Sequence, residues 1–364
     1  MAFSAEEHNH MAHALRLAER GLYTTTPNPR VGCVIVRGGA VVGEGWHERA
    51  GEAHAEAVAL QAAGERARGA TAYVSLEPCH HHGRTPPCDQ ALVAAGVARV
   101  VAAMRDPDPR TSGAGMEFLR AAGVDVASGL LEREAGELNI GYVARITRGR
   151  PWTRLKIAAS LDGKTALNNG ASQWITGTAA RRDGHHWRAR ACAVLTGIGT
   201  VREDDPQLTV REVDTSRQPL RIVVDSRLEI PLSARLLAEG RLLIVCAKEN
   251  TNKIMQLQGK GAEVITIPNS AGKVDLPALM AELARRGLNE VHIEAGFRLN
   301  GSLLNEGCVD ELLLYLAPHV LGDRARGMFD LPELTDLGAR RDLRIHELRT
   351  VGDDIRVTAR LEHR

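Results

Sequence analysis

The amino-acid sequence predicts two α/β domains in one chain. A length of 364 residues suits about two domains of ordinary size. Helix-like and strand-like segments alternate over both halves, as in α/β proteins. A polar run ending in Gly149, Arg150 and Pro151 separates the halves. We therefore expect a first domain over residues 1–147 and a second over residues 148–364.

The first half has the element order of a three-layer α/β domain with a mixed sheet. Ser4 and Glu7 form a capping-box pattern at the start of a helix with regularly spaced apolar residues. Two apolar runs around Gly38 and Gly39 predict a hairpin. The other expected elements are helices at 54–63, 89–95 and 117–122 and strands at 72–76, 97–103 and 124–126.

The second half predicts a largely parallel sheet with helices. Two of its strands run into glycine turns, at 197–199 and 295–296, which suit a cofactor phosphate and a simple tight turn equally well. Neither turn is a full G-x-G-x-x-G motif, so a Rossmann site is not indicated. Expected strands are 153–158, 193–196, 220–225, 242–246, 263–267, 291–294 and 311–317, and expected helices are 179–189, 276–286 and 299–305.

Composition excludes several classes of protein. Residues are 44% hydrophobic and 25% charged, and the net charge of +1 argues against a nucleic-acid partner. No run of about eighteen apolar residues predicts a membrane span, and the first residues show no secretory pattern. Six cysteines in a chain of this kind indicate a reducing, cytoplasmic setting rather than a disulfide framework.

Three residues carry the donor atoms of a zinc site: His54, Cys79 and Cys88. A catalytic zinc takes about three protein ligands and keeps one position for water, whose pKa it lowers. Glu56 is expected to move protons outside the metal shell, as in zinc nucleobase deaminases. In a regular helix, His54 and Glu56 would point roughly 200° apart. We therefore expect them at a frayed first turn, where both side chains can face one pocket. Pro78 predicts that Cys79 begins a helix.

The eight residues between the two cysteines are more than the two residues of the short deaminase signature. Two other interpretations therefore stay open. One is a closed zinc site, with His81 or His82 as fourth ligand and Glu56 as an exposed helix residue. The other treats the run from His80 to His82 as a solvated loop.

Several segments together resemble the bifunctional deaminase/reductase of riboflavin biosynthesis, and the long inter-cysteine loop is part of that resemblance. Two positions depart from the family pattern: His80 stands where serine is common, and 294–296 read E-A-G in place of E-G-G. The matching segments are 26–32, 51–56, 76–79 and 81–88 in the first half and 159–164, 172–176, 199–201, 204–206 and 310–312 in the second.

The resemblance implies a cytidine-deaminase-like three-layer α/β/α domain followed by a dihydrofolate-reductase-like α/β domain. It implies zinc-dependent deamination of 2,5-diamino-6-ribosylamino-4(3H)-pyrimidinone 5′-phosphate. Reduction of the ribosyl group to ribityl by NADPH would follow. Zn²⁺ and NADPH are the implied cofactors, and a homodimer or homotetramer is the implied assembly.

The same resemblance implies the residues of each site. Zinc would be held by His54, Cys79 and Cys88, with Glu56 catalytic. Substrate and cofactor residues would be Asn28, His47 and Arg84 for the deaminase substrate; Ala158, Trp174, Thr200, Asp204, Ser226, Gly296, Phe297, Arg298, Leu299, Asn300, Gly301 and Ser302 for NADPH; and Ser172, Arg188, Leu208, Arg211 and Glu294 for the sugar phosphate.

Other roles remain open for several of these residues. Asn28 beside two prolines also suits a turn, and Arg188 and Arg211 also suit a solvated surface. Trp174 could anchor a core, and Lys156 could face a cleft or lie on a surface strand. No residue identifies itself as the proton donor of the reduction. A cytidine- or adenosine-type deaminase with an unrelated second domain, or a binding protein with a structural zinc, are the competing functions.

Overall fold

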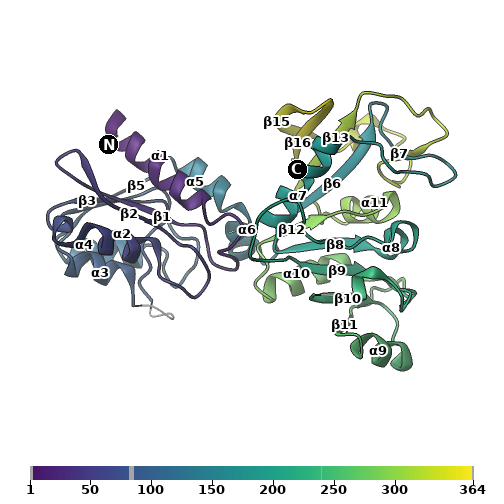
Figure 1. Cartoon of the computed structure of the whole chain (residues 1–364), viewed down its shortest axis with the longest axis horizontal. Coiled ribbons are helices and arrows are strands. Elements are labelled where there is room, and N and C mark those ends of the chain that lie inside the picture. The colour runs from purple at the N-terminus through teal and green to yellow at the C-terminus, as the bar shows by residue number, and fades with distance from the viewer. Residues whose placement is uncertain (1–2, 82–85, 239, 363–364) are drawn as a thin grey trace. The chain divides into compact units, whose positions relative to one another are not determined.

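A computed structural model describes residues 3–81, 86–238 and 240–362. The chain forms two compact units, Met1–Gly149 and Arg150–Arg364 (Figure 1). The polar run expected as a linker is the last turn of helix α6 (Ile140–Arg148), which ends at Gly149 in a left-handed conformation with φ 66°. The two units therefore divide directly after this helix.

The first unit holds a five-stranded mixed sheet in the order β2-β1-β3-β4-β5. Strand β1 pairs antiparallel with β2 and β3, whereas β3, β4 and β5 are parallel. The predicted capping box of Ser4 and Glu7 is confirmed at the start of α1. The elements are α1 (Ala5–Glu19), β1 (Gly32–Arg37), β2 (Ala40–Trp46), α2 (Ala55–Ala63), β3 (Thr71–Val74), α3 (Cys88–Ala94), β4 (Arg99–Ala102), α4 (Ala114–Ala121), β5 (Asp125–Ser128), α5 (Glu132–Leu138) and α6.

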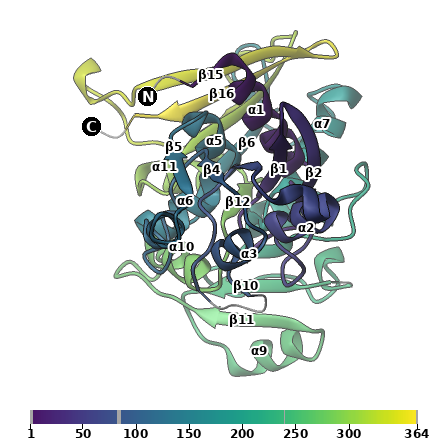
Figure 2. The same cartoon turned by 90° about the vertical axis from the view of Figure 1, so that its left-hand side faces the viewer.

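Helices cover both faces of this sheet, which confirms the three layers (Figures 1 and 2). Apolar residues of α1 and α5 pack on one face, and those of α2, α3 and α4 on the other. Alanines on α2 let that helix lie close to the sheet: a Cβ added to Gly43 of β2 would fall 2.3 Å from the carbonyl oxygen of Ala59. This close packing fixes the N-terminal end of α2, where His54 and Glu56 lie.

The second unit is built on a nine-stranded sheet in the order β11-β10-β9-β8-β12-β6-β13-β16-β15. The seven strands from β11 to β13 are parallel, which confirms the predicted largely parallel sheet. An antiparallel hairpin that the sequence did not predict closes the other end. The strands are β6 (Trp152–Ser160), β8 (Ala193–Gly197), β9 (Leu220–Val224), β10 (Leu242–Cys246), β11 (Ala262–Thr266), β12 (Glu290–Ile293), β13 (Glu311–Ala317), β15 (Leu343–Val351) and β16 (Asp354–Leu361).

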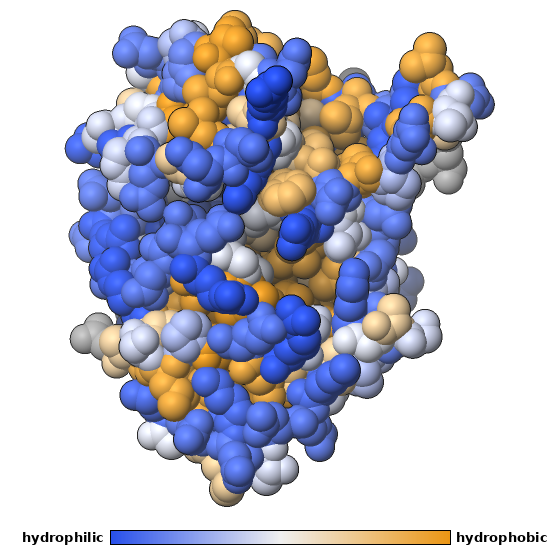
Figure 3. Space-filling view, turned by 90° about the vertical axis from the view of Figure 1, so that its right-hand side faces the viewer, coloured by the Kyte–Doolittle hydropathy of each residue, from blue (hydrophilic) through white to orange (hydrophobic). Residues whose placement is uncertain are grey.

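Helices lie on both faces of the large sheet. The helices α7 (Thr178–Arg190), α8 (Ile198–Asp204) and α9 (Thr251–Gln258) pack on one face, and α10 (Leu276–Arg285) and α11 (Phe297–Asn305) on the other. A small ribbon of β7 (Lys164–Ala166) and β14 (Arg326–Gly327) stands apart. Seen from the side that carries β7 and α8, the surface of this unit is hollowed, with hydrophobic side chains in the hollow (Figure 3). Within the described ranges, no helix is long and apolar enough to cross a membrane.

Candidate active sites

Three segments of the first unit bring His54, Cys79 and Cys88 together. His54 immediately precedes α2, Cys79 follows β3, and Cys88 is the first residue of α3. The Nδ1 atom of His54 lies 3.3 Å from Sγ of Cys88 and 3.6 Å from Sγ of Cys79, and all three donor atoms lie within 4.8 Å of one another. Tetrahedral zinc with ordinary bond lengths would separate nitrogen from sulfur by about 3.6 Å. The donor set therefore fits a zinc ion.

Two local expectations about this cluster need correction. Cys88, rather than Cys79, begins a helix, because residues 77–81 and 86–87, on either side of the undescribed residues, belong to no helix or strand. His54 is not in the helix at all: it caps α2 with an extended backbone, φ −75° and ψ 161°. This conformation removes the helical separation, so that His54 and Glu56 both reach the cluster.

The two thiols differ in how readily they ionise. The pKa of Cys79 is lowered to about 4 by hydrogen bonds from Cys88 and His54, although burial opposes the shift. The pKa of Cys88 is raised, first by its hydrogen bond to Cys79 and then by burial. The hydrogen bond with Cys79 raises the pKa of His54. A bound divalent cation would favour the thiolate form of both cysteines.

Glu56 lies inside the protein beside these donor atoms. Its side chain is only 3% exposed, so the interpretation as an exposed helix residue is wrong. Burial raises the pKa of Glu56 to about 7; the nearby Cys79 adds to the rise and His54 opposes it. A carboxyl group with a pKa near neutrality both accepts and returns protons at physiological pH.

His47 and Asn28 lie next to the cluster. The His47 ring makes an edge contact with the His54 ring, with centroids 5.3 Å apart. Burial lowers the pKa of His47, so a neutral ring donates from Nδ1 to the carbonyl of Ala53 at 3.0 Å and accepts at Nε2 from the Asn28 amide at 3.1 Å. Asn28 thus bonds to a side chain of the site. Arg84, predicted to contact the same substrate, lies outside the described residues.

Glu77, which sequence reasoning missed, holds the segment that carries Cys79. Its carboxylate is 3% exposed and accepts three backbone N–H groups, from Asp106 at 3.2 Å, Gly113 at 3.0 Å and Met116 at 3.3 Å. Helix α4 begins after Gly113, which offers no capping side chain, so Glu77 caps that helix from another segment. The one available signal was its place directly before Pro78 and Cys79.

Hydrogen bonds fix the first two residues of the inter-cysteine loop. His80 Nδ1 lies 2.5 Å from the carboxylate of Asp89, which is fully buried. His81 Nδ1 lies 3.1 Å from Oγ1 of Thr111. Of the described residues, the metal cluster contains His54, Cys79 and Cys88, so His81 is not its fourth ligand. His82, the other proposed fourth ligand, falls outside the described residues.

Two side chains near the end of the first unit support these segments from behind. Asn139, between α5 and α6, exchanges two hydrogen bonds with the backbone of Arg30, at 2.8 and 2.9 Å. Tyr142 of α6 donates to the buried carboxylate of Asp106 at 2.9 Å. The loop that carries Asn28 and the loop that bonds to Glu77 therefore both rest on the last helices of the unit.

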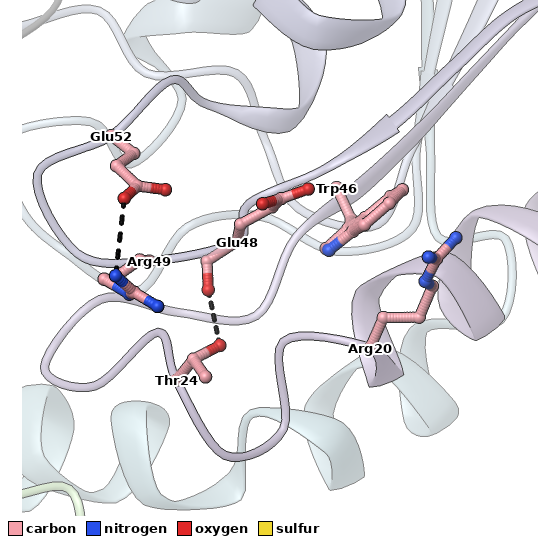
Figure 4. A pocket seen from close by; sticks show the side chains of 6 residues that line it. All are labelled: Arg20, Thr24, Trp46, Glu48, Arg49 and Glu52. Atoms are coloured by element: carbon pink, nitrogen blue, oxygen red, sulfur yellow. Dashed lines mark hydrogen bonds and ion pairs between the residues drawn. The ribbon is translucent and has the colours of Figure 1, made fainter. Parts of the chain in front are cut away.

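The first unit has a cavity of about 430 Å³. Figure 4 shows the side chains that line it. The guanidinium of Arg20 stacks on Trp46 at 3.5 Å from the ring centre, and Arg49 pairs with Glu52 at 3.9 Å. Trp46 and Glu48 flank His47 in sequence, but no predicted site residue lines the cavity, and its positive and negative side chains balance. The lining residues are Arg20, Thr24, Trp46, Glu48, Arg49 and Glu52.

In the second unit, the residues predicted for NADPH gather in part where β8 and β12 end. The starts of α8 and α11 lie together: a Cβ added to Gly296 would fall 3.7 Å from Thr200 Oγ1, and one added to Gly197 would fall 3.0 Å from Leu299. Ala295, the family departure, does not have a positive φ, so alanine fits there without strain. Gln173 donates to Asp204 at 3.3 Å, which ties the loop of Trp174 to α8.

Other predicted cofactor residues lie elsewhere. Asn300 is buried and donates to the carbonyl of Met328 at 3.2 Å, and a Cβ on Gly301 would fall 2.0 Å from the carbonyl oxygen of Asp330, so both face residues 328–330. Ser226 follows β9, where its hydroxyl accepts the backbone N–H of Val274 at 3.1 Å. Ala158 lies on β6, and Phe297, Arg298 and Ser302 lie on α11. Ser172, predicted for the sugar phosphate, is half-buried in the loop before α7.

The structure decides between the alternatives for Trp174 and Lys156. Trp174 is 69% exposed, so it is not a core anchor; the Arg181 guanidinium lies 4.7 Å from its ring centre. Lys156 is half-buried, with its amine 5.9 Å from the ring centre of Tyr315, so it is not a solvated surface lysine. Burial lowers the pKa of Lys156.

The residues predicted for the sugar phosphate converge on α7. Arg188 makes a two-pronged ion pair with Glu294 and donates to the carbonyl of Thr209 at 3.1 Å. The guanidinium of Arg211 donates to Gln207 and to Thr209 Oγ1, both at 3.0 Å. Leu208, between Gln207 and Thr209 in the sequence, has a left-handed backbone conformation with φ 55°. Arg188 is 16% exposed, so the solvated-surface alternative is wrong for it.

Comparison with known proteins identifies the family. Residues 151–357 match the RibD C-terminal domain, and residues 4–104 match the cytidine and deoxycytidylate deaminase zinc-binding region. The chain belongs to the RibD family. It is therefore a bifunctional enzyme of riboflavin biosynthesis that joins a zinc-dependent deaminase to an NADPH-dependent reductase. This excludes a cytidine- or adenosine-type deaminase with an unrelated second domain, and a binding protein.

Relatives match almost the whole chain. The riboflavin biosynthesis protein RibD of Escherichia coli (strain K12) is 47% identical over 96% of this chain and 98% of its own. Among solved structures, RibD of Acinetobacter baumannii is 41% identical with a TM-score of 0.91, over 98% of this chain and 99% of that one. A Thermotoga maritima protein described as a diaminohydroxyphosphoribosylaminopyrimidine deaminase/5-amino-6-(5-phosphoribosylamino)uracil reductase is 31% identical with a TM-score of 0.86, over the same shares.

Proposed function

We propose that this chain deaminates 2,5-diamino-6-ribosylamino-4(3H)-pyrimidinone 5′-phosphate and then reduces the ribosyl group with NADPH. The product is 5-amino-6-(5-phosphoribitylamino)uracil. We assign the deaminase to the first unit and the reductase to the second; the boundary expected at 147/148 falls in the last turn of α6. The observation that carries the proposal is the convergence of three metal-donor atoms beside the buried carboxyl of Glu56. The described activities of the Thermotoga relative support the choice of substrate.

Zinc held by His54, Cys79 and Cys88 would supply a water of lowered pKa. The Glu56 carboxyl takes one proton from the attacking water and delivers it to the ring nitrogen. It then carries the second proton, from the new hydroxyl group on the ring carbon, to the amine, which departs as ammonia. Asn28 and His47 hold the pyrimidine, and their mutual hydrogen bond fixes both side chains before substrate arrives. Arg84 contacts the same substrate.

In the reductase domain, we assign NADPH to the ends of β8, β9 and β12. The contact residues are Ala158, Trp174, Thr200, Asp204, Ser226 and the start of α11 from Gly296 to Ser302. Trp174 supports this placement because most of its ring surface is open for stacking. The sugar phosphate is held by Ser172, Arg188, Leu208, Arg211 and Glu294, of which Arg188 and Glu294 already pair with each other.

The decisive experiment follows ammonia and NADPH together. The protein, loaded with zinc, receives the diaminopyrimidine phosphate and NADPH. We expect ammonia release, followed by NADPH consumption that depends on the deaminated product. Glu56→Gln should keep its zinc, because it removes no ligand, but should lower ammonia release by about 10²- to 10⁴-fold. Adding the deaminated compound should restore NADPH consumption by this variant, and full deaminase activity in Glu56→Gln would contradict the assigned role.

The proposed assembly is a homodimer, or a homotetramer built from such dimers. Its support is the edge strand β15, which has β16 as its one neighbour among the described strands and exposes Leu343, Ile345 and Leu348 at 43%, 62% and 62%. Ile345 lies opposite Ala359 and Leu348 opposite Val357, so the hairpin presents one apolar face that a second copy would cover.

Light scattering on the Ile345→Lys, Leu348→Lys double variant tests this assembly. We expect the mass of a monomer, whereas Leu337→Lys, at an exposed position outside the strand, should leave the assembly intact. An unchanged mass in the double variant would reject this interface. We further propose a cytoplasmic location, supported by six free cysteine thiols and by the reducing cofactor.

A further inference from the structure

The segment 208–211, which carries Leu208 and Arg211, is held by side chains instead of by a neighbouring strand. It belongs to no helix or strand, yet Leu208 and Val210 are only 2% and 6% exposed. The left-handed φ of 55° at Leu208 is unfavourable for a leucine and persists only where surrounding contacts fix the backbone. The contacts of this segment show what fixes it.

Two side chains of α7 form hydrogen bonds with the backbone of this segment. His185 and Arg188 are three residues apart, so they lie on the same face of the helix. Arg188 Nη1 donates to the carbonyl of Thr209 at 3.1 Å, and the backbone N–H of Arg211 donates to His185 Nδ1 at 3.2 Å. Together they hold both ends of the three-residue stretch that leads into the Arg211 side chain.

Gln218 holds the middle of the same stretch. Its amide oxygen accepts the N–H of Val210 at 2.8 Å, and its amide nitrogen donates to the carbonyl of Val210 at 3.0 Å. The backbone groups from the Thr209 carbonyl to the Arg211 N–H are therefore all bound by side chains. The position of Arg211 is set before any ligand arrives.

Charge around Arg211 suits an anion. Arg211 is exposed to solvent. Partial burial and then the cations Arg188 and Arg235 lower the pKa of Arg211, and Glu212 and Glu294 oppose this shift, so two other cations lie near its guanidinium. Arg188 uses its guanidinium on Glu294 and Thr209, whereas the partners of the Arg211 guanidinium among the described residues are neutral oxygens. Arg211 is thus the better group for a phosphate.

His185 has the protonation state that this arrangement needs. It is 8% exposed, and burial together with Arg188 and Arg211 lowers the pKa of His185 to about 4. The ring is therefore neutral near pH 7, with Nδ1 available to accept the Arg211 N–H.

We propose that His185 is a positioning residue of the reductase: through the Arg211 backbone it presents the Arg211 guanidinium to the 5′-phosphate of the substrate. This inference rests on the proposed function, which assigns Arg211 to that phosphate. His185 itself does not touch the substrate. Its loss should therefore weaken substrate binding while leaving hydride transfer in the bound complex nearly unchanged.

The test compares His185→Leu with His185→Asn in the full-length, zinc-loaded enzyme. Leucine removes the acceptor, and we expect KM for the deaminated ribosylamino phosphate to rise about 3- to 10-fold, the effect of one hydrogen bond, with kcat within about twofold. Asparagine places an oxygen near the Nδ1 position and should restore KM. Calorimetric titration with ribose 5-phosphate should show the same order of affinity. His186→Gln, at an exposed position of the same helix, is the matched control.

The outcomes separate this inference from the function beneath it. If KM of His185→Leu matches the parent while Arg211→Ala raises KM, the role of His185 is overturned and the phosphate assignment stands. If Arg211→Ala also leaves KM unchanged, the phosphate assignment itself fails. Should His185→Leu not fold, His185→Gln takes its place: its oxygen falls near Nε2 instead of Nδ1, and an unchanged KM there overturns the inference equally.

Discussion

Replacing Glu77 by alanine should destabilise the segment that carries Cys79. The change leaves the N–H groups of Asp106, Gly113 and Met116 inside the protein without their acceptor. Each buried donor left unpaired costs about 1–3 kcal/mol, so we expect a total of about 3–5 kcal/mol after partial entry of water. Glutamine should cost about 1–2 kcal/mol, because its oxygen can still accept from Asp106 and Gly113, which share Oε2.

Chelator competition measures the consequence for zinc. If zinc binding requires an ordered Cys79 segment, the lost free energy of folding in Glu77→Ala should weaken zinc affinity by about 10²- to 10³-fold. The smaller loss in Glu77→Gln should weaken it by about tenfold. Glu117→Ala is the control, since Glu117 is an exposed glutamate in the first turn of the same helix α4. Zinc affinity within twofold of the parent in Glu77→Ala would refute the reasoning.

Three further predictions concern the first unit. Gly115→Ala should reduce zinc content and deaminase activity, because its Cβ would lie 2.2 Å from the Pro78 carbonyl oxygen, whereas Gly136→Ala, with no atom within 4 Å, should be neutral or stabilising. Burial raises the pKa of Asp106 to about 6, so the protonated carboxyl stabilises the fold at low pH, and this contribution is lost as pH rises from about 4 to about 6. Over that window, urea unfolding should show the free energy of unfolding of the parent falling by roughly 2 kcal/mol relative to Asp106→Asn. The same pH dependence of stability in both proteins would contradict this prediction. Zinc chelation should abolish ammonia release yet spare NADPH consumption on the deaminated compound; equal loss of both activities would refute separate sites.

Strongly apolar elements could be predicted from the sequence, and two kinds of element could not. Strand β13 has the predicted limits, Glu311–Ala317, because every residue of it is apolar or paired inside the sheet. Helix α6 was missed because its last turn, Arg145–Arg148, reads as a polar linker. Strand β15 was missed because most of its residues are exposed and a bulge after Ile345 breaks the alternation of its side chains.

The metal ligands could be predicted because chemistry fixes their residue types and the family fixes their spacing. Supporting residues have no such signature. Glu77 bonds to Met116 across 39 residues, and Asn139 to Arg30 across 109. These contacts reach backbone groups, which every residue type offers, so no pattern of side chains in the sequence marks the partner. His185 stayed hidden for the same reason, since its partner is the N–H of Arg211.

The bonds from Asn139 and Tyr142 bear on how the two activities could be separated by dissection. The recognised zinc-binding region ends at residue 104, yet Arg30 inside it and Asp106 just beyond it have hydrogen-bond partners at 139 and 142. A recombinant fragment that stops at the recognised region would lose β5 and the last three helices of its unit and leave the backbone of Arg30 without its amide partner. A self-sufficient deaminase piece has to run to Gly149, 45 residues beyond the recognised region that ends at residue 104.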